Sequence, residues 1–168
     1  YYDGLAGTSS ENSTADIARL TQSPTVLVVS AKGMSLTLAA LLRGFLQFEQ
    51  NTIRGVILNG ISPRMTDYYA GIVEQNTGLS VFGAMPTDAA CAVESRHLGL
   101  VTAGEIQNLK QKMQALARHA RDGLQLDALL ALARTAPELQ EQLPPVPVCG
   151  TGLRIGVSFA KGLCYGLR

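Results

Sequence analysis

Continuous apolar runs alternate along this chain with segments in which apolar residues recur every three or four positions. Residues 25–30 (TVLVVS) and 54–59 (RGVILN) are typical of strands buried on both faces of a parallel sheet, and residues 79–84 predict a third strand. The intervening segments 35–50 and 62–77 predict helices. This order indicates an α/β fold with three layers, in which a parallel sheet is flanked by helices.

Capping signals predict where several helices begin. Ser13 with Asp16, and Thr102 with Glu105, have the spacing of a capping box, in which the carboxylate reaches back toward the cap amide. The first predicts a short helix that ends before Pro24, and the second a longer amphipathic helix. Five helices are therefore expected, beginning at Ser13, Ser35, Ser62, Thr102 and Leu126.

The C-terminal part of the chain predicts a domain boundary. Residues 143–152 contain three prolines and two glycines, which is typical of a linker, and the run after them predicts the first strand of another domain over residues 153–168. Residues 1–142 are then one domain. Because the chain begins at Tyr1 without methionine and stops directly after a strand-like run, both ends are expected to be cuts in a longer protein.

Composition narrows the possible partners. Hydrophobic residues make up 46% of the 168 and charged residues 16%, which favours a packed globular chain. Fourteen basic and thirteen acidic residues give a net charge of +1 with no dense basic run, so neither nucleic acid nor a membrane is the expected partner, and a small ligand is. No apolar run approaches the roughly 20 residues that span a bilayer.

The cysteines and histidines predict neither a disulfide framework nor a zinc site. Cys91, Cys149 and Cys164 form no CxxC pair, and their odd number fits a reducing, cytoplasmic location. His97 and His119 lie far apart with no ligand partner at helix spacing, so a metal site formed by them is not expected.

Several strings occur in an order that resembles one family. They are YYDG (1–4), NSTADIARL (12–20), TVLVVSAKGMS (25–35), RGVILNGISPR (54–64), GAMPTD (83–88) and ESRHLGLVTAGE (94–105). Together they resemble the cobyrinic acid a,c-diamide synthases, with RHLGL as the most specific string. The tail RIGVSFAKGLCYG resembles the start of the family's glutamine amidotransferase domain, although its Cys164 does not stand in a nucleophile motif.

The resemblance implies a P-loop NTPase fold like that of dethiobiotin synthetase. Residues 1–142 would then be the C-terminal portion of a nucleotide-binding amidoligase domain, with residues 153–168 beginning the amidotransferase domain. The implied activity belongs to cobalamin biosynthesis. ATP with Mg²⁺ phosphorylates the a and c side-chain carboxylates of cobyrinic acid or a similar carboxylated tetrapyrrole, and ammonia from glutamine displaces the phosphate to leave an amide.

The resemblance also implies nucleotide-binding residues. Asp3 ends a family motif that holds Mg²⁺ or orients the phosphates, although the glutamate that begins this motif is missing here; by itself, Asp-Gly is a common turn. Asn59 follows a strand where its amide suits the adenine edge, or it is a turn residue. Pro86 would form the other side of the base pocket.

The candidate substrate-binding residues each have a structural alternative. Ser13 and Thr14 are first a helix cap and second a site for a substrate carboxylate at a helix N-terminus. Lys32 either neutralises a phosphate or carboxylate or is simply solvated. Arg96 and His97 suit a carboxylate-rich macrocycle, or they anchor a loop.

Two departures from the family pattern leave other interpretations open. No GxxxxGK[ST] string is present, and Ser30 stands where the family's strand usually ends in aspartate. In the family that loop precedes this segment, so the chain alone is expected to bind ATP poorly and to catalyse nothing. The alternatives are an a,c-diamide synthase of a nickel tetrapyrrole and a noncatalytic truncated binding module.

Missing strands would also expose an apolar edge of the sheet. Such an edge predicts association of the chain, including a homo-oligomer.

Overall fold

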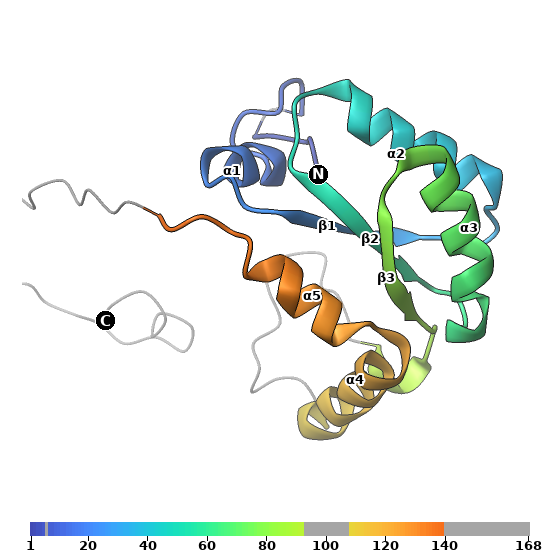
Figure 1. The fold of residues 1–168 in the computed structure, drawn as a ribbon. Helices are drawn as coiled ribbons and strands as arrows, with labels where there is room; N and C mark the ends of the chain where they lie inside the picture. The colour runs from blue at the N-terminus through green and yellow to red at the C-terminus, as the bar shows by residue number, and fades with distance from the viewer. Residues whose placement is uncertain (6, 93–107, 140–168) are drawn as a thin grey trace, which may run out of the picture. The chain divides into compact units, whose positions relative to one another are not determined.

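The fold is built from short alternating strands and helices. The computed structural model describes residues 1–5, 7–92 and 108–139. The helices are α1 (Thr14–Leu20), α2 (Leu36–Phe48), α3 (Thr66–Thr77), α4 (Leu109–Gly123) and α5 (Leu126–Ala133), the strands are β1 (Thr25–Ser30), β2 (Ile53–Asn59) and β3 (Ser80–Met85), and the single turns of 3₁₀ helix are η1 (Pro63–Met65) and η2 (Ala89–Cys91) (Figure 1).

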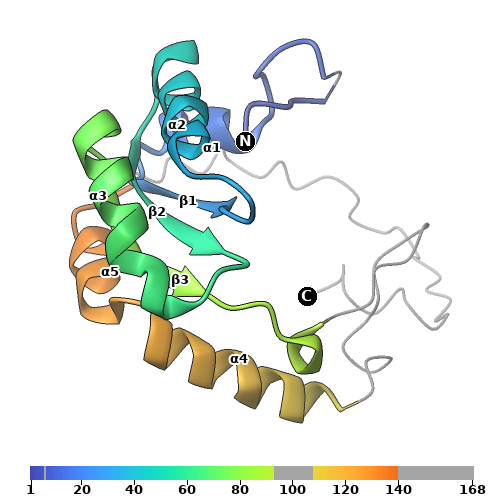
Figure 2. The same cartoon turned by 90° about the vertical axis from the view of Figure 1, so that its right-hand side faces the viewer.

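The three described strands form a parallel sheet in the order β1-β2-β3. The last residues of the strands are in register, since Ser30 pairs with Asn59 and Asn59 pairs with Met85. Figure 2 shows the strands pointing the same way, with their carboxyl ends at one edge of the sheet. The α/β class and the parallel sheet predicted from the apolar runs are therefore confirmed.

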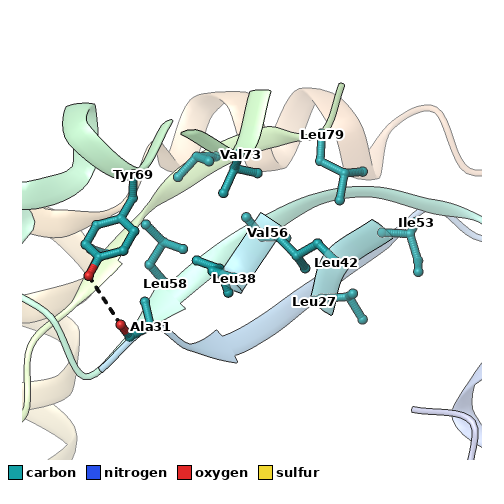
Figure 3. Packing of buried hydrophobic residues seen from close by; sticks show 12 residues of the cluster. Leu27, Ala31, Leu38, Leu42, Ile53, Val56, Leu58, Tyr69, Val73 and Leu79 are labelled. Carbon is teal, nitrogen blue, oxygen red and sulfur yellow. Dashed lines mark hydrogen bonds between the residues drawn. The ribbon is translucent and has the colours of Figure 1, made fainter. Parts of the chain in front are cut away.

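The main core lies between one face of the sheet and helices α2 and α3. Leu38 and Leu42 from α2 and Val73 from α3 are fully buried against Val56 and Leu58 of β2 (Figure 3). Burying an aliphatic side chain of this size contributes roughly 1.5–3 kcal/mol. These five buried side chains hold α2 and α3 against the sheet. The loops that follow β1 and β2 lead into these helices, so their positions are set by the same packing.

The two outer strands of the sheet have different edges. The edge of β3 is covered by the segment between α4 and α5, because Leu124 bridges Gly83 and the amide of Gln125 donates to the carbonyl of Phe82 at 2.8 Å. β1 pairs with β2 and with no other described strand. Association through the free edge of β1 stays a prediction.

Most element boundaries agree with the sequence pattern to within one or two residues: β3 lies one residue later than predicted, β2 begins one residue earlier, and α2 ends at Phe48. β1 has the predicted bounds, and α3 ends at Gly78, which has φ 73°. Local structure at two helix starts also differs. Ser62 and Pro63 begin the 3₁₀ turn η1 rather than α3 itself. The cap of α1 forms as expected at Ser13, but the carboxylate of Asp16 accepts from the amide of Asn12 (3.0 Å), one residue before the cap.

Residues 1–138 form one compact unit. The capping box at Thr102 and Glu105, the expected linker (143–152) and the expected second domain (153–168) lie outside the described residues. These domain boundaries remain expectations.

Two glycines provide a test of how closely β2 and β3 pack. A Cβ on Gly55 would lie 2.6 Å from the carbonyl oxygen of Ser80, so Gly55→Ala forces the two strands apart and is expected to lower the free energy of unfolding by about 1–3 kcal/mol. Gly71, inside α3, has nothing within 4 Å of its Cβ position. Gly71→Ala should therefore raise the free energy of unfolding by about 0.5–1 kcal/mol. Urea denaturation measures the free energy of unfolding of both variants. The same change in that free energy for Gly55→Ala and Gly71→Ala would contradict the close packing of β2 against β3.

Candidate functional site

The loops that follow the three strands meet at the carboxyl edge of the sheet. Lys32 follows β1, Asn59 ends β2, and Pro86 follows β3. A Cβ placed on Gly60 would lie 3.6 Å from Oγ1 of Thr87 and 4.0 Å from Cβ of Lys32, so all three loops are within reach of one point. Open parallel sheets bind ligands outside this edge. We call these five residues the carboxyl-edge site.

Backbone hydrogen bonds hold the carboxyl-edge site in shape. The amide of Ala31 donates to the carbonyl of Asn59 at 3.1 Å, and the amide of Gly60 donates to the carbonyl of Met85 at 2.9 Å. Gly60 has φ 81°, a left-handed conformation that glycine adopts without strain. The chain therefore turns directly after Asn59 while the backbone stays tied to both neighbouring loops.

A buried tyrosine supports the loop that carries Lys32. The hydroxyl of Tyr69 on α3 is close to the carbonyl oxygens of Ala31 (3.3 Å) and Met34 (2.8 Å), to which it can donate (Figure 3 shows the contact with Ala31). Its position below the loop fixes the backbone on both sides of Lys32. The charged end of Lys32 is left to the solvent side.

The polar side chains of the carboxyl-edge site are available to a ligand. Asn59 and Lys32 are both exposed, and neither side chain hydrogen-bonds or pairs with another described residue. A carboxamide offers a donor and an acceptor side by side, which suits the edge of a heteroaromatic base. An ammonium group suits a phosphate or carboxylate. The site can thus accept a planar polar group together with an anion.

Asp3 lies away from the carboxyl-edge residues, in a groove between the N-terminal residues and α2. It lines an open groove of about 400 Å³ together with Tyr1, Tyr2, Leu41, Gly44, Phe45 and Phe48. The ring of Tyr2 stacks on Phe45 with centroids 5.9 Å apart, and its hydroxyl donates to the Phe45 carbonyl at 2.6 Å. Asp3 is the one charged side chain among these lining residues, in mostly aromatic surroundings.

Ser13 and Thr14 lie at the start of α1. Ser13 is 2% exposed, and its Oγ accepts a hydrogen bond from the amide of Asp16 at 3.3 Å, so the capping interpretation is confirmed. Asp16 also pairs with Arg19 at 2.7 Å, and Arg19 reaches Glu49 at the end of α2. This small network joins α1 to α2. A role of Ser13 and Thr14 in substrate binding stays a prediction.

The structure thus brings some of the predicted site residues together and separates others. Lys32, Asn59 and Pro86 meet at the carboxyl edge, whereas Asp3 lies in the groove on α2. Within the described residues, no pocket or hydrogen bond joins Asp3 to Asn59. A shared role of Asp3 and Asn59 in binding one nucleotide stays a prediction.

Other residues complete or extend the predicted set. Arg96 and His97 lie outside the described residues. Sequence reasoning missed Gly60 and Thr87 as members of the carboxyl-edge site. Gly60 directly follows Asn59, and Thr87 directly follows Pro86. Their positions just after predicted strands were therefore the signal that could have identified them.

The comparisons with known proteins identify the family. A family model described as an AAA domain matches residues 3–95, which is more than half of the chain and contains the whole carboxyl-edge site. The chain belongs to this AAA domain family. No solved structure is significantly similar.

Curated relatives of this AAA domain chain carry one name. Cobyrinate a,c-diamide synthase of Clostridium tetani is 32% identical over 99% of the chain and 37% of the relative. The enzymes of that name from Listeria monocytogenes and Limosilactobacillus reuteri are 36% and 33% identical, over 94% and 98% of the chain, respectively, and 36% of each relative. The resemblance drawn from the motifs is confirmed. The chain spans somewhat over a third of the length of these relatives.

No helix within the described residues is long and apolar enough to cross a membrane.

The contacts of Asp16 at the start of α1 predict that the stability of the fold depends on pH. The hydrogen bond from the Asn12 amide and then the pairing with Arg19 hold the pKa of Asp16 below its ordinary value of 3.8. A folded-state pKa below the unfolded one means that this contribution to stability is present above about pH 4 and is lost as the pH falls through the folded value. Asp16→Asn should therefore lower the melting temperature at pH 7 and have little effect near pH 2.

The control is Asp67→Asn, which removes another first-turn carboxylate, on α3, that pairs with no described side chain. Thermal unfolding followed by circular dichroism should show a smaller loss for Asp67→Asn at pH 7. Equal losses in the two variants would mean that the helix dipole, rather than the Asn12 and Arg19 contacts, accounts for the effect of Asp16.

Proposed function

We propose that this chain supplies the base-binding part of an ATP-dependent ligase that amidates the a and c carboxylates of cobyrinic acid. The observation that carries the proposal is the approach of Lys32 and of Thr87, the neighbour of Pro86, to Gly60 directly after Asn59, at the edge of a parallel sheet where nucleotides bind. The name that the curated relatives share, cobyrinate a,c-diamide synthase, supports the choice of substrate.

The proposed reaction solves a leaving-group problem. A carboxylate is a poor acyl donor, so its oxygen first takes the γ-phosphoryl group of ATP, which gives an acyl phosphate and ADP. Ammonia released from glutamine then attacks the acyl carbon and expels inorganic phosphate, which leaves the amide. Mg²⁺ positions the phosphates and neutralises their charge. The two carboxylates are treated in turn.

The carboxyl-edge site fits the adenine part of ATP. We assign the exposed amide of Asn59 to the polar edge of the base and Pro86 to one side of its ring. Gly60 between them has no side chain, so a flat ring can approach the backbone. Lys32 supplies a positive charge for a phosphate or for a substrate carboxylate.

We assign few residues to Mg²⁺ and to the macrocycle. Asp3 would provide one carboxylate to Mg²⁺, a cation that typically keeps several waters and takes its other ligands from the phosphates of its nucleotide. The described residues of its groove hold no second carboxylate. We assign Arg96 and His97 to the carboxylates of the macrocycle, with Ser13 and Thr14 as a further contact.

Removing the Asn59 amide tests the assignment of the base site. In the intact protein that carries this sequence, Asn59→Ala should raise the KM for ATP about tenfold, because two hydrogen bonds of roughly 0.5–1 kcal/mol each are lost. The kcat and the KM for cobyrinic acid should change little. Amidation followed by mass spectrometry, with ATP varied, measures all three constants.

The matched control is Asn76→Ala on α3, whose side chain donates to the carbonyl of Ile72 away from the carboxyl edge. This variant should keep the wild-type KM for ATP. An unchanged KM for ATP in Asn59→Ala would refute the base site, and amidation of neither cobyrinic acid nor a nickel tetrapyrrole would refute the ligase proposal as a whole.

A noncatalytic module is the second candidate. The Ser30 at the end of β1, where the resembled family usually has aspartate, favours it. Such a module would bind a carboxylated tetrapyrrole by Lys32 and neighbouring groups without any ATP hydrolysis. Calorimetric titration of the intact protein with ATP and with cobyrinic acid separates the two candidates, since only the ligase requires both to bind.

A further inference from the structure

Three side chains of kinds that bind metals lie together beside the segment that follows β3. Asp88, Cys91 and His119 each offer one ligand atom, and these atoms all lie within 4.8 Å of one another. The closest pair is Nε2 of His119 and a carboxylate oxygen of Asp88, at 2.7 Å. The same carboxylate oxygen is 3.8 Å from the sulfur of Cys91. All three residues are partly exposed, so an ion can reach them.

Local structure explains why these side chains face one another. Asp88 caps the turn η2, and its other carboxylate oxygen accepts from the amide of Ala90 at 2.8 Å, which fixes the direction of the carboxylate. Cys91 is the last residue of that turn. His119 comes from α4, which lies beside η2 (Figure 2). Lys112 of α4 donates to the carbonyl of Ala92, which is a second tie between the two elements.

We propose that Asp88, Cys91 and His119 form a binding site for a divalent transition metal, with Zn²⁺ as the best match. A thiolate, an imidazole and a carboxylate are the three ligand types that zinc uses in proteins, and three protein ligands leave a fourth position for water. The carboxylate and the thiolate together carry two negative charges, which balance those of the ion. Harder ions such as Mg²⁺ prefer oxygen ligands and do not match this set.

The geometry needs only small adjustments to hold the ion. With zinc to ligand distances of roughly 2.0–2.3 Å, the ligand atoms of a tetrahedral site lie roughly 3.3–3.8 Å apart. The widest separation here, up to 4.8 Å, must close and the contact of 2.7 Å must open, both by rotation of partly exposed side chains. The nearby cations Lys112 and Arg118 oppose the ion, but the carboxylate and the thiolate lie closer to it because they bind it directly.

The proposed site is independent of the proposed ligase activity. Asp88 lies two residues after Pro86, and His119 is 31 residues further on, in α4. A bound metal would therefore tie the segment after β3 to α4. The expected result is a more rigid Pro86 and Thr87 segment, whichever ligand the carboxyl-edge site takes.

Cobalt titration tests the site directly. The chain with Cys149→Ser and Cys164→Ser retains Cys91 as its one thiol. Adding Co²⁺ to this protein should give a thiolate-to-cobalt absorption band in the near ultraviolet and visible bands of tetrahedral cobalt, both saturating at one equivalent. Adding Zn²⁺ should then remove both bands and raise the melting temperature.

Further variants decide whether these three residues bind the ion. Cys91→Ser in the same background should abolish the thiolate band, and His119→Ala should weaken cobalt binding about tenfold or more. Asp122→Asn, which removes a carboxylate one turn further along α4, should leave the titration unchanged. Circular dichroism of each variant shows whether it is folded.

Two results would overturn the proposal. One is a titration without a thiolate band in a folded protein that contains Cys91. The other is a loss of melting temperature in His119→Ala with no effect of Zn²⁺ on either protein, which would make the cluster a hydrogen-bonded tether and not a metal site.

Discussion

The parallel pairing of β2 with both neighbouring strands is the interaction on which the described structure depends. It sets Ser30, Asn59 and Met85 in one row at the carboxyl edge. The buried side chains of β2, with Val56 and Leu58 fully inaccessible, hold this register against α2 and α3. A slip of one residue would turn these side chains to the other face of the sheet, so the apolar core and the site are specified together.

The fold was largely predictable because its strands are short apolar runs, which have few alternatives in an α/β protein. Helix starts were less predictable. Pro63 has no amide hydrogen, and the chain makes a 3₁₀ turn there before α3 begins. At α1, Asn12 has φ 61°, which turns its amide toward Asp16, and no sequence pattern distinguishes that arrangement from a standard capping box.

The same contrast applies to the sites. Lys32, Asn59 and Pro86 follow three consecutive strands, and in a parallel sheet that order places them at one edge. The surroundings of Asp3 depend instead on Tyr2 packing against Phe45, a contact over 43 residues. The meeting of Asp88 with His119 depends on how α4 packs beside η2. Spacing rules for metal sites detect only ligand pairs that are close in the sequence, so they could not show that Asp88 and Cys91 lie beside His119.

The departure at Ser30 changes the electrostatics of the carboxyl-edge site in a definite direction. An aspartate there, as in the resembled family, would stand two residues before Lys32 and next to Asn59 in the sheet. Its charge would compensate the ammonium group and weaken the attraction of any other anion. With serine in this position, Lys32 pairs with no described carboxylate. Lys32 therefore places a positive charge, which no described carboxylate pairs with, beside a neutral amide, and this favours a ligand that joins a planar polar ring to an anion over a ligand that carries a cation.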